Sequence, residues 1–460
     1  MPDNSFSEKS SFRDPSGFLF WKSGEIYRQI NPIYKEHYEH LINSGLYERL
    51  TNERLLVAHE EVNDDGLRQN EAFKIIKPEV IPFISYPYEW CFSQLKDAAL
   101  ATLKIQRIAL EYGMTLKDAS AYNIQFKDGS PMLVDTLSFE KYTEGKPWVA
   151  YRQFCQHFFA PLALMAMRDI RLGQLMRIYI DGIPLDLASR LLPLRSFVRF
   201  SFVSHIHMHA KAQTRFGQKN LNVKKYKVGK TLLFGIIDNL ESAISKFNWK
   251  PEGTEWAEYY EDTNYTSQAL ERKKTLIDEY LDLIKPKSVW DLGANTGLFS
   301  RLASTRGINT IAFDIDPSAV EKNYLECKSK KETHLLPLIL DLTNPSPDAG
   351  WANEERMSLI RRGPADMVFA LALIHHLAIS NNLPFTHIAD FLSRICRYLV
   401  IEYVPKEDSQ VQRLLRTRED IFTSYNVDDF ELSFKSFFIL MRKDNIKDSK
   451  RVIYLYKLKE

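Results

Sequence analysis

The sequence has few of the features that mark secreted, metal-binding or membrane-spanning proteins. It holds only four cysteines in 460 residues, and no two of them form a Cys-x-x-Cys pair, so neither a zinc knuckle nor a disulfide framework is indicated. The amino terminus is polar and lacks the apolar stretch of a signal peptide, and the longest apolar run, near residues 157–167, is too short to cross a bilayer. These absences predict a cytoplasmic protein with reduced, structural thiols.

The chain also lacks a strong net charge. Its 61 Lys and Arg nearly balance 59 Asp and Glu, and a net charge of +2 disfavours a dedicated nucleic-acid binder. Residues 190–230 are the exception, because they hold ten Lys and Arg, interleaved aromatics and no acid. This stretch could track a nucleic-acid backbone, but helices with apolar inner and basic outer faces explain it better. The nearby run S-H-I-H-M-H lacks acids or thiols, so no metal site is predicted.

Length and hydrophobic pattern predict at least two folded domains. Residues 1–15 are expected to be mobile, and residues 16–185 to form an α+β domain that opens with a β-hairpin. Residues 186–250 are expected to form a helical basic bridge. From 251 to 460, strands and helices alternate. This alternation predicts an α/β domain in which helices cover both faces of a parallel sheet, with two closing strands able to pair antiparallel.

The clearest motif follows the first apolar strand of the second domain. It reads V-W-D-L-G-A-N-T-G and contains Asp291, Gly293, Asn295 and Gly297. The glycines allow the backbone to turn sharply close to a ligand, and Asp291 places a carboxylate at the carboxyl end of the strand, where α/β sheets bind ligands. The loop lacks the closely spaced first glycine pair of dinucleotide sites, so NAD is disfavoured and a cationic cofactor is favoured.

Acidic residues also end the next two strands. Asp314 ends T-I-A-F-D about 20 residues beyond the loop, the distance at which such folds place a ribose-binding carboxylate. Asp316, which precedes Pro317, is expected to cap the following helix. Asp341 and Leu342 end the third strand, where an adenine amino group could be hydrogen-bonded.

Together, these motifs and the segment D-M-V-F-A-L-A-L-I-H-H from Asp366 resemble class I S-adenosylmethionine-dependent methyltransferases, from about Trp256 to the carboxyl terminus. The resemblance implies a seven-stranded Rossmann-like domain, S-adenosyl-L-methionine as cofactor and methyl transfer as the reaction. More loosely, the whole chain is similar to bacterial two-part proteins of the methyltransferase or nodulation type. That similarity leaves the acceptor unspecified.

The expected chemistry needs few reactive residues. A sulfonium leaves without a proton, so the enzyme supplies alignment, a dry cavity and, for a hydroxyl acceptor, a base. His375 and His376 follow the fourth strand and are the candidate bases, one of which is expected to turn inward as a structural histidine. Glu402, at a comparable strand end, could orient the acceptor. Trp256 and Tyr265 are candidate lid residues over the sulfonium, with core packing as the alternative.

The first domain resembles kinases of the aminoglycoside-phosphotransferase-like kind. Asp118 and Asn123 have the D-x-x-x-x-N spacing, and Asp135 ends the next strand. In kinases such residues position the acceptor hydroxyl and hold magnesium against the phosphates of ATP. Kinases also use a lysine to bind these phosphates, and Lys74 or Lys77 could serve as that lysine. The sequence departs from the kinase pattern, because D-T-L replaces D-F-G and no glycine-rich phosphate loop is present. A scaffold or acceptor-recognition module is therefore favoured over a working Mg-ATP phosphotransferase.

Three functions remain open from the sequence. The favoured one is methyl transfer to a small-molecule or carbohydrate-like hydroxyl, ahead of RNA or protein acceptors. The alternatives are a bifunctional kinase and methyltransferase, and a non-catalytic protein that only binds S-adenosylmethionine. The sequence does not determine the acceptor or the oligomeric state.

Overall fold

The computed structural model describes residues 6–63, 67, 71–210, 229–251, 266–416 and 419–459. The chain separates into two compact units. Unit 1 comprises residues 1–250 with 350–356, and unit 2 comprises residues 251–349 with 357–460. All four cysteines are buried free thiols. Among the helices of the described ranges, none is long and apolar enough to cross a membrane.

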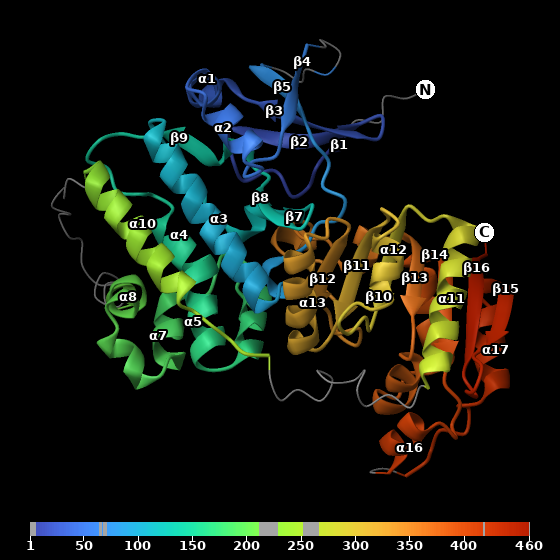
Figure 1. Cartoon of the computed structure of the whole chain (residues 1–460). Helices are drawn as coiled ribbons and strands as arrows, with labels where there is room; N and C mark the ends of the chain where they lie inside the picture. Colours follow the sequence, from blue (N-terminus) through green and yellow to red (C-terminus); the bar gives the residue numbers. More distant parts are fainter. Residues whose placement is uncertain are drawn as a thin grey trace. The chain divides into compact units, whose positions relative to one another are not determined.

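Unit 1 begins with a five-stranded antiparallel sheet (Figure 1). The predicted opening hairpin is confirmed, since β2 and β3 pair in register and are joined by Ser23 and Gly24. Both joining residues have positive φ, 53° and 81°, as a tight two-residue hairpin turn requires. The strand order is β1-β2-β3-β5-β4, with bounds β1 (Phe6–Ser7), β2 (Gly17–Lys22), β3 (Glu25–Ile30), β4 (His59–Val62) and β5 (Lys74–Pro78).

The rest of unit 1 is mostly helical and is organised around a long buried helix, α3 (Phe92–Glu111). The residues expected to form a separate basic bridge fall within this unit. Helix α10 (Lys230–Ser245) lies along α3, where Lys96 Nζ donates 2.8 Å hydrogen bonds to the carbonyls of Ser245 and Phe247. Within the described residues, the other α-helices of unit 1 are α1 (Lys35–Asn43), α2 (Leu46–Asn52), α4 (Tyr151–Phe154), α5 (Ala160–Met167), α6 (Leu175–Ile178), α7 (Leu185–Leu191) and α8 (Phe200–Phe202).

Unit 1 also contains two short antiparallel strand pairs. Strands β7 (Ile124–Lys127) and β8 (Ser130–Leu133) pair antiparallel, as do β6 (Met114–Leu116) and β9 (Phe139–Lys141). Residues 350–356 also belong to this unit, although they lie in the sequence between two strands of unit 2. Within unit 1, Arg13 Nε donates a 2.7 Å hydrogen bond to buried Glu355, and the Arg356 guanidinium lies 4.2 Å from the centre of the Tyr122 ring.

Unit 2 contains the predicted seven-stranded sheet, which confirms the α/β class for this half of the chain. The strand order is β12-β11-β10-β13-β14-β16-β15. The first five strands are parallel, and β16 pairs antiparallel with both β14 and β15, as the sequence pattern predicts. The bounds are β10 (Ser288–Leu292), β11 (Asn309–Asp314), β12 (Leu335–Ile339), β13 (Ala365–Ala370), β14 (Cys396–Tyr403), β15 (Phe438–Asn445) and β16 (Val452–Leu458).

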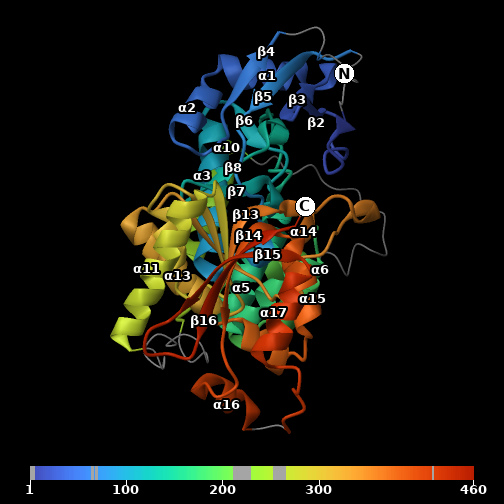
Figure 2. The same cartoon turned by 90° about the vertical axis from the view of Figure 1, so that its right-hand side faces the viewer.

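Helices cover both faces of this sheet. Figure 2 shows α11 and α13 on one face and α15 and α17 on the other. The apolar side of α11, including Ala269, Ile277 and Tyr280, packs against strand residues such as Val289 and Met367 in a buried hydrophobic cluster. The bounds are α11 (Ser267–Ile284), α12 (Ser300–Ser304), α13 (Pro317–Lys330), α14 (Leu359–Arg362), α15 (Phe385–Ser393), α16 (Ser409–Leu415) and α17 (Val427–Lys435). This framework places the ends of the parallel strands, and the loops that follow them, at one edge of the sheet.

Candidate functional site

A cavity of about 380 Å³ lies at the carboxyl ends of the parallel strands of unit 2. Its volume is in the range of small-molecule sites, roughly 300–1,000 Å³. Many of the residues singled out in the sequence line it together, namely Asp291, Gly293, Asn295, Asp314, Asp341, Leu342 and His376. Gly297, His375 and Glu402 are not among its lining residues in the described part of unit 2. The fold thus brings these acids and the first glycine of the loop into the lining of one cavity.

The loop after β10 has the backbone that its composition predicts. Gly293, Asn295 and Gly297 all adopt positive φ, at 76°, 50° and 82°. The loop is held to the next strand because Gly293 N–H and Ala294 N–H each donate a 2.9 Å hydrogen bond to the Phe313 carbonyl. Gly297 has a second reason to be glycine, since a Cβ there would lie 2.6 Å from Asn323 Nδ2. Gly297 therefore allows the loop to pack closely against Asn323 and does not itself line the cavity.

Two buried carboxyl groups lie at neighbouring strand ends in this cavity. Asp291 Oδ2 accepts a 2.6 Å hydrogen bond from the Ser300 hydroxyl, and burial raises the pKa of Asp291 to about 6. Asp314 accepts hydrogen bonds from the backbone N–H groups of Asn295 (2.7 Å) and Asp316 (2.9 Å), and burial again raises its pKa to about 6. Carboxylates with such pKa values lack sufficient countercharge, so this cavity favours a ligand that brings positive charge or hydroxyl donors.

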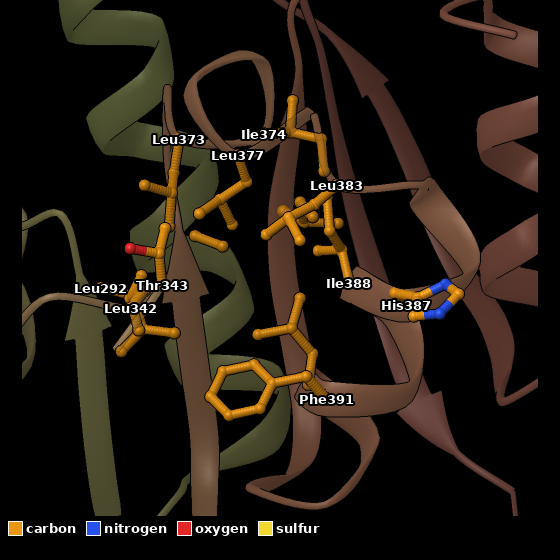
Figure 3. Close-up of a pocket in the computed structure, with 13 residues that line it drawn as sticks. Leu292, Leu342, Thr343, Leu373, Ile374, Leu377, Leu383, His387, Ile388 and Phe391 are labelled. Atoms are coloured by element: carbon orange, nitrogen blue, oxygen red, sulfur yellow. The ribbon is translucent and has the colours of Figure 1, made fainter. Parts of the chain in front are cut away.

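The end of β12 opens onto a second, apolar pocket of about 180 Å³ (Figure 3). Leu342, Thr343, Leu373 and Leu377 line both the pocket and the larger cavity. In Figure 3 these side chains face Ile388 and Phe391 of α15 across the pocket, and the ring of exposed His387 points away from it. The region beside Asp341 and Leu342, where the sequence suggested an adenine site, is therefore bordered by aliphatic side chains and one aromatic ring.

The two candidate histidines have different environments. His376 begins a π-helical turn, η11 (His376–Ser380), and lines the cavity. Burial, together with the nearby charge of Arg451, lowers the pKa of His376 to about 4, so the ring is neutral at pH 7. His375 is fully buried and turned inward, and within the described residues neither of its ring nitrogens has a hydrogen-bond partner. Burial holds the pKa of His375 well below its ordinary value. Of the two, His376 is the histidine that a ligand in the cavity can contact.

Glu402 lies inside a buried charge network. Its carboxylate accepts hydrogen bonds from Lys273 Nζ at 2.6 Å and from the Ala372 N–H at 2.9 Å, and Arg451 Nη1 lies 3.4 Å from Glu402 Oε1. Arg451 in turn donates two hydrogen bonds, 2.7 and 3.0 Å long, to Asp408. Because Ala372 belongs to the loop that carries both histidines, Glu402 positions that loop and does not itself line the cavity.

Lys273 is a functional candidate that the sequence reading missed. It lies on the core-facing side of α11 and lines the cavity, with its ammonium 4.5 Å from the centre of the Phe299 ring. Burial lowers its pKa, although the Glu402 carboxylate opposes this effect. The available signal was a charged residue between Ala269 and Ile277 on the apolar face of an amphipathic helix.

Asp118, Asn123 and Asp135, whose spacing in the sequence resembles that of a kinase site, lie near one another in unit 1, and an arginine pairs with Asp135. Burial raises the pKa of Asp118, with a further contribution from Asp135, and Asp118 hydrogen-bonds to Asn123. Asp135 forms an ion pair with Arg28 of β3, and it accepts a 2.6 Å hydrogen bond from Ser138. Although burial acts to raise it, the pKa of Asp135 is held below its ordinary value, chiefly by Arg28. Among the described residues, no cluster of three His, Cys, Asp or Glu side chains could hold a metal ion.

Other sequence candidates occupy less informative positions. Lys74 and Lys77 lie on β5 and form ion pairs with Glu61 and Glu25 rather than with the Asp135 region. In the run S-H-I-H-M-H, His205 hydrogen-bonds to Tyr151 and Asn239, whereas His207 hydrogen-bonds to Ser189 and Ser196. Trp256 and Tyr265 lie outside the described residues, as does part of the basic stretch 190–230.

Comparison with known proteins identifies one full-length relative. The chain is 33% identical over 458 residues to the nodulation protein NoeA of Rhizobium meliloti strain 1021, and the match covers 98% of this chain and 96% of that protein. No family model matches the chain.

Solved structures resemble about half of the chain at low identity. The PH0226 protein of Pyrococcus horikoshii is 17% identical and covers 45% of this chain and 100% of its own, with a TM-score of 0.32. Magnesium protoporphyrin IX methyltransferase ChlM of Synechocystis, with bound S-adenosylhomocysteine, is 14% identical and covers 44% and 93%, with a TM-score of 0.32. The N-methyltransferase NodS of Bradyrhizobium japonicum is 11% identical and covers 45% and 94%, with a TM-score of 0.32. Likenesses this distant do not bear on the chemistry of the chain.

Proposed function

The chain belongs to the family of the nodulation protein NoeA, and we propose that it is an S-adenosylmethionine-dependent methyltransferase acting on a small-molecule or carbohydrate-like hydroxyl. One observation carries the proposal: two buried acids of raised pKa, Asp291 and Asp314, end neighbouring strands in a single cavity that adjoins an apolar pocket. Each of these features matches one part of that methyl donor.

The donor set fits the cofactor part by part. The Asp291 carboxylate is suited to an ammonium group, and Asp314 is suited to ribose hydroxyls at the end of the second parallel strand. Leu342 and Leu373 border the apolar pocket and offer a flat, non-polar surface for the adenine ring, with Asp341 near its amino group. The loop from Gly293 to Gly297 lets the backbone come close to the ligand without side chains in between.

The protein's part in the reaction is alignment and proton acceptance. When bound, S-adenosylmethionine supplies an electrophilic methyl group on a sulfonium. His376, which is neutral at pH 7, can accept a hydrogen bond from the acceptor hydroxyl and then its proton. Glu402 holds the loop that carries His376 through its hydrogen bond to Ala372, so the ring is kept at the cavity wall. The aliphatic lining limits water near the reacting atoms.

Cofactor affinity is expected to fall in acid. Binding of an ammonium requires the ionised form of Asp291, whose pKa is about 6 in the free protein. Protons therefore compete with the ligand below pH 6, and affinity is retained above it. We expect the dissociation constant of S-adenosylhomocysteine to rise about tenfold from pH 7 to pH 5 for this group alone. Isothermal titration calorimetry across this range measures the effect, and an affinity that is flat or improves in acid would contradict the assignment.

Methyl transfer is tested with a labelled donor. The full-length protein is incubated with methyl-labelled S-adenosylmethionine and cell extract, which is then separated into metabolite, glycan, RNA and protein pools. We expect label in the metabolite or glycan pool, and about a 100-fold slower rate for His376→Asn, the usual loss for a general base. His334→Asn, at an exposed histidine directly before β12 and at the opposite end of the sheet from the cavity, is the matched control and should keep the rate. Unchanged labelling in His376→Asn would remove His376 as the base. Absence of label from every pool would favour a non-catalytic, cofactor-binding protein.

In this proposal, unit 1 is a kinase-like scaffold or acceptor-recognition module. The ion pair between Arg28 and Asp135 supports this role, because it neutralises the carboxylate that a kinase would use for magnesium. A bifunctional kinase would have to break this pair before Asp135 could contact a metal ion.

A further inference from the structure

Lys273 and Asp291 give the cavity two opposite charges on adjacent elements. Lys273 projects from α11 and Asp291 ends β10, both side chains are buried, and both line the same cavity. Their charges affect each other, since Asp291 acts to raise the pKa of Lys273 and Lys273 acts to lower that of Asp291. Buried lysine is rare in proteins unless it is paired, because removing an ammonium group from water is costly.

The hydrogen bond to Glu402 fixes the position of the Lys273 side chain. It does not by itself require a lysine among the residues that line the cavity. Glu402 also accepts a hydrogen bond from the Ala372 N–H and forms an ion pair with Arg451, so its charge has a second cationic partner besides Lys273. An apolar residue at position 273 would continue the core face formed by Ala269, Leu276 and Ile277. The chain instead has a lysine among the residues that line the cavity, with its ammonium group held by a 2.6 Å hydrogen bond to Glu402.

An α-amino acid group carries the complementary pair of charges, an ammonium and a carboxylate. Its ammonium suits the carboxylate of Asp291, and its carboxylate suits the ammonium of Lys273. We propose that Lys273 binds the carboxylate of the amino-acid part of the cofactor, with Glu402 and Arg451 as positioning residues behind it. This assignment rests on the proposed function and adds a specificity-determining residue to it.

The test uses two ligands that differ only in the carboxylate, S-adenosylmethionine and decarboxylated S-adenosylmethionine. For the wild-type full-length protein, calorimetry should give about 50-fold weaker binding of the decarboxylated ligand, the usual effect of losing one buried, charge-assisted contact. For Lys273→Met, the two ligands should bind with dissociation constants within about threefold of each other. S-adenosylhomocysteine, which keeps the carboxylate, should also bind about 50-fold more weakly to Lys273→Met.

Two further variants separate recognition from folding. Lys274→Met removes a half-buried neighbour that pairs with Glu271, and it should keep the wild-type preference for the carboxylate. The double variant Lys273→Met, Glu402→Gln removes both charges of the buried pair, so no carboxylate of this pair is left unpaired. If the double variant folds and has lost the preference for the carboxylate, the loss is due to the missing lysine. Thermal melting identifies any variant that does not fold.

The outcomes are distinct. Equal weakening of both ligands in Lys273→Met, or a wild-type protein that does not distinguish them, would overturn the role of Lys273 and leave the proposed function intact. A wild-type protein that binds neither S-adenosylmethionine nor S-adenosylhomocysteine would overturn the proposed function and this inference with it. If Lys273→Met bound both ligands as the wild type does but lost methyl transfer, Lys273 would act on the acceptor and the proposed contact with the cofactor carboxylate would be wrong.

Discussion

Replacing Arg451 with methionine is expected to lower the free energy of unfolding of unit 2 by about 3–5 kcal/mol. Arg451 is 1% exposed and donates two hydrogen bonds to Asp408, and it also forms an ion pair with Glu402. Methionine fills much of the same volume but leaves two carboxylates without their arginine partner. Because an unpaired buried charge costs more than a lost surface contact, we expect the melting transition to fall by roughly 10 °C.

A surface ion pair provides the control. Asp390 of α15 and Arg394, which directly follows the helix, form an ion pair with an N–O distance of 2.6 Å, and both side chains are exposed. Arg394→Met should cost about 0.3–0.5 kcal/mol, as exposed pairs of this spacing do. Both variants are compared by denaturant unfolding followed by circular dichroism. Equal stability of the two variants would show that the network around Arg451 does not hold unit 2 together.

Replacing Asp314 with asparagine is expected to weaken S-adenosylhomocysteine binding about 100-fold or more. The carboxylate now accepts hydrogen bonds from the N–H groups of Asn295 and Asp316, and the remaining lone pairs are available to ribose hydroxyls. An asparagine has only one acceptor oxygen, so its NH₂ group must face one of these N–H donors. Both the ribose contacts and the shape of the loop are then lost.

Asp366 is the matched control for this variant. It is the second residue of β13, at the opposite end of the sheet from the cavity, and accepts a 2.8 Å hydrogen bond from the Lys287 N–H. Asp366→Asn should leave the calorimetric dissociation constant within about threefold of wild type. A similar value for Asp314→Asn would contradict the ribose assignment.

Features that depend on neighbouring residues were predictable from the sequence. The loop from Asp291 to Gly297 is one example, because its glycines and its asparagine adopt the positive φ that their residue types favour. The alternation of strands and helices after residue 251 likewise predicted the sheet of unit 2, including the antiparallel pairing of its last two strands. Periodicity and turn chemistry are local, so one sequence is enough to read them.

Features that depend on distant residues were not predictable. Lys273 and Glu402 are 129 positions apart, and Arg28 and Asp135 are 107 positions apart, so nothing in either local pattern indicates the pairing. The sequence offered Lys74 and Lys77 for the site near Asp135, whereas the fold provides Arg28. The two histidines after β13 illustrate the same limit, since only the packing of the sheet decides that His375 turns inward and His376 faces the cavity.

Residues 350–356 belong to unit 1, although the residues on both sides of them in the sequence belong to unit 2. A cut after residue 250 would separate Glu355 from Arg13 and Arg356 from Tyr122, contacts that belong to unit 1. The amino-terminal fragment would lack residues 350–356, and the carboxy-terminal fragment would carry them without the residues of unit 1 that they contact. Neither fragment would then contain a whole unit. Biochemical dissection of the two units should therefore proceed by point substitution in the intact polypeptide, and genetic exchange of either half between relatives must carry this heptapeptide along with unit 1.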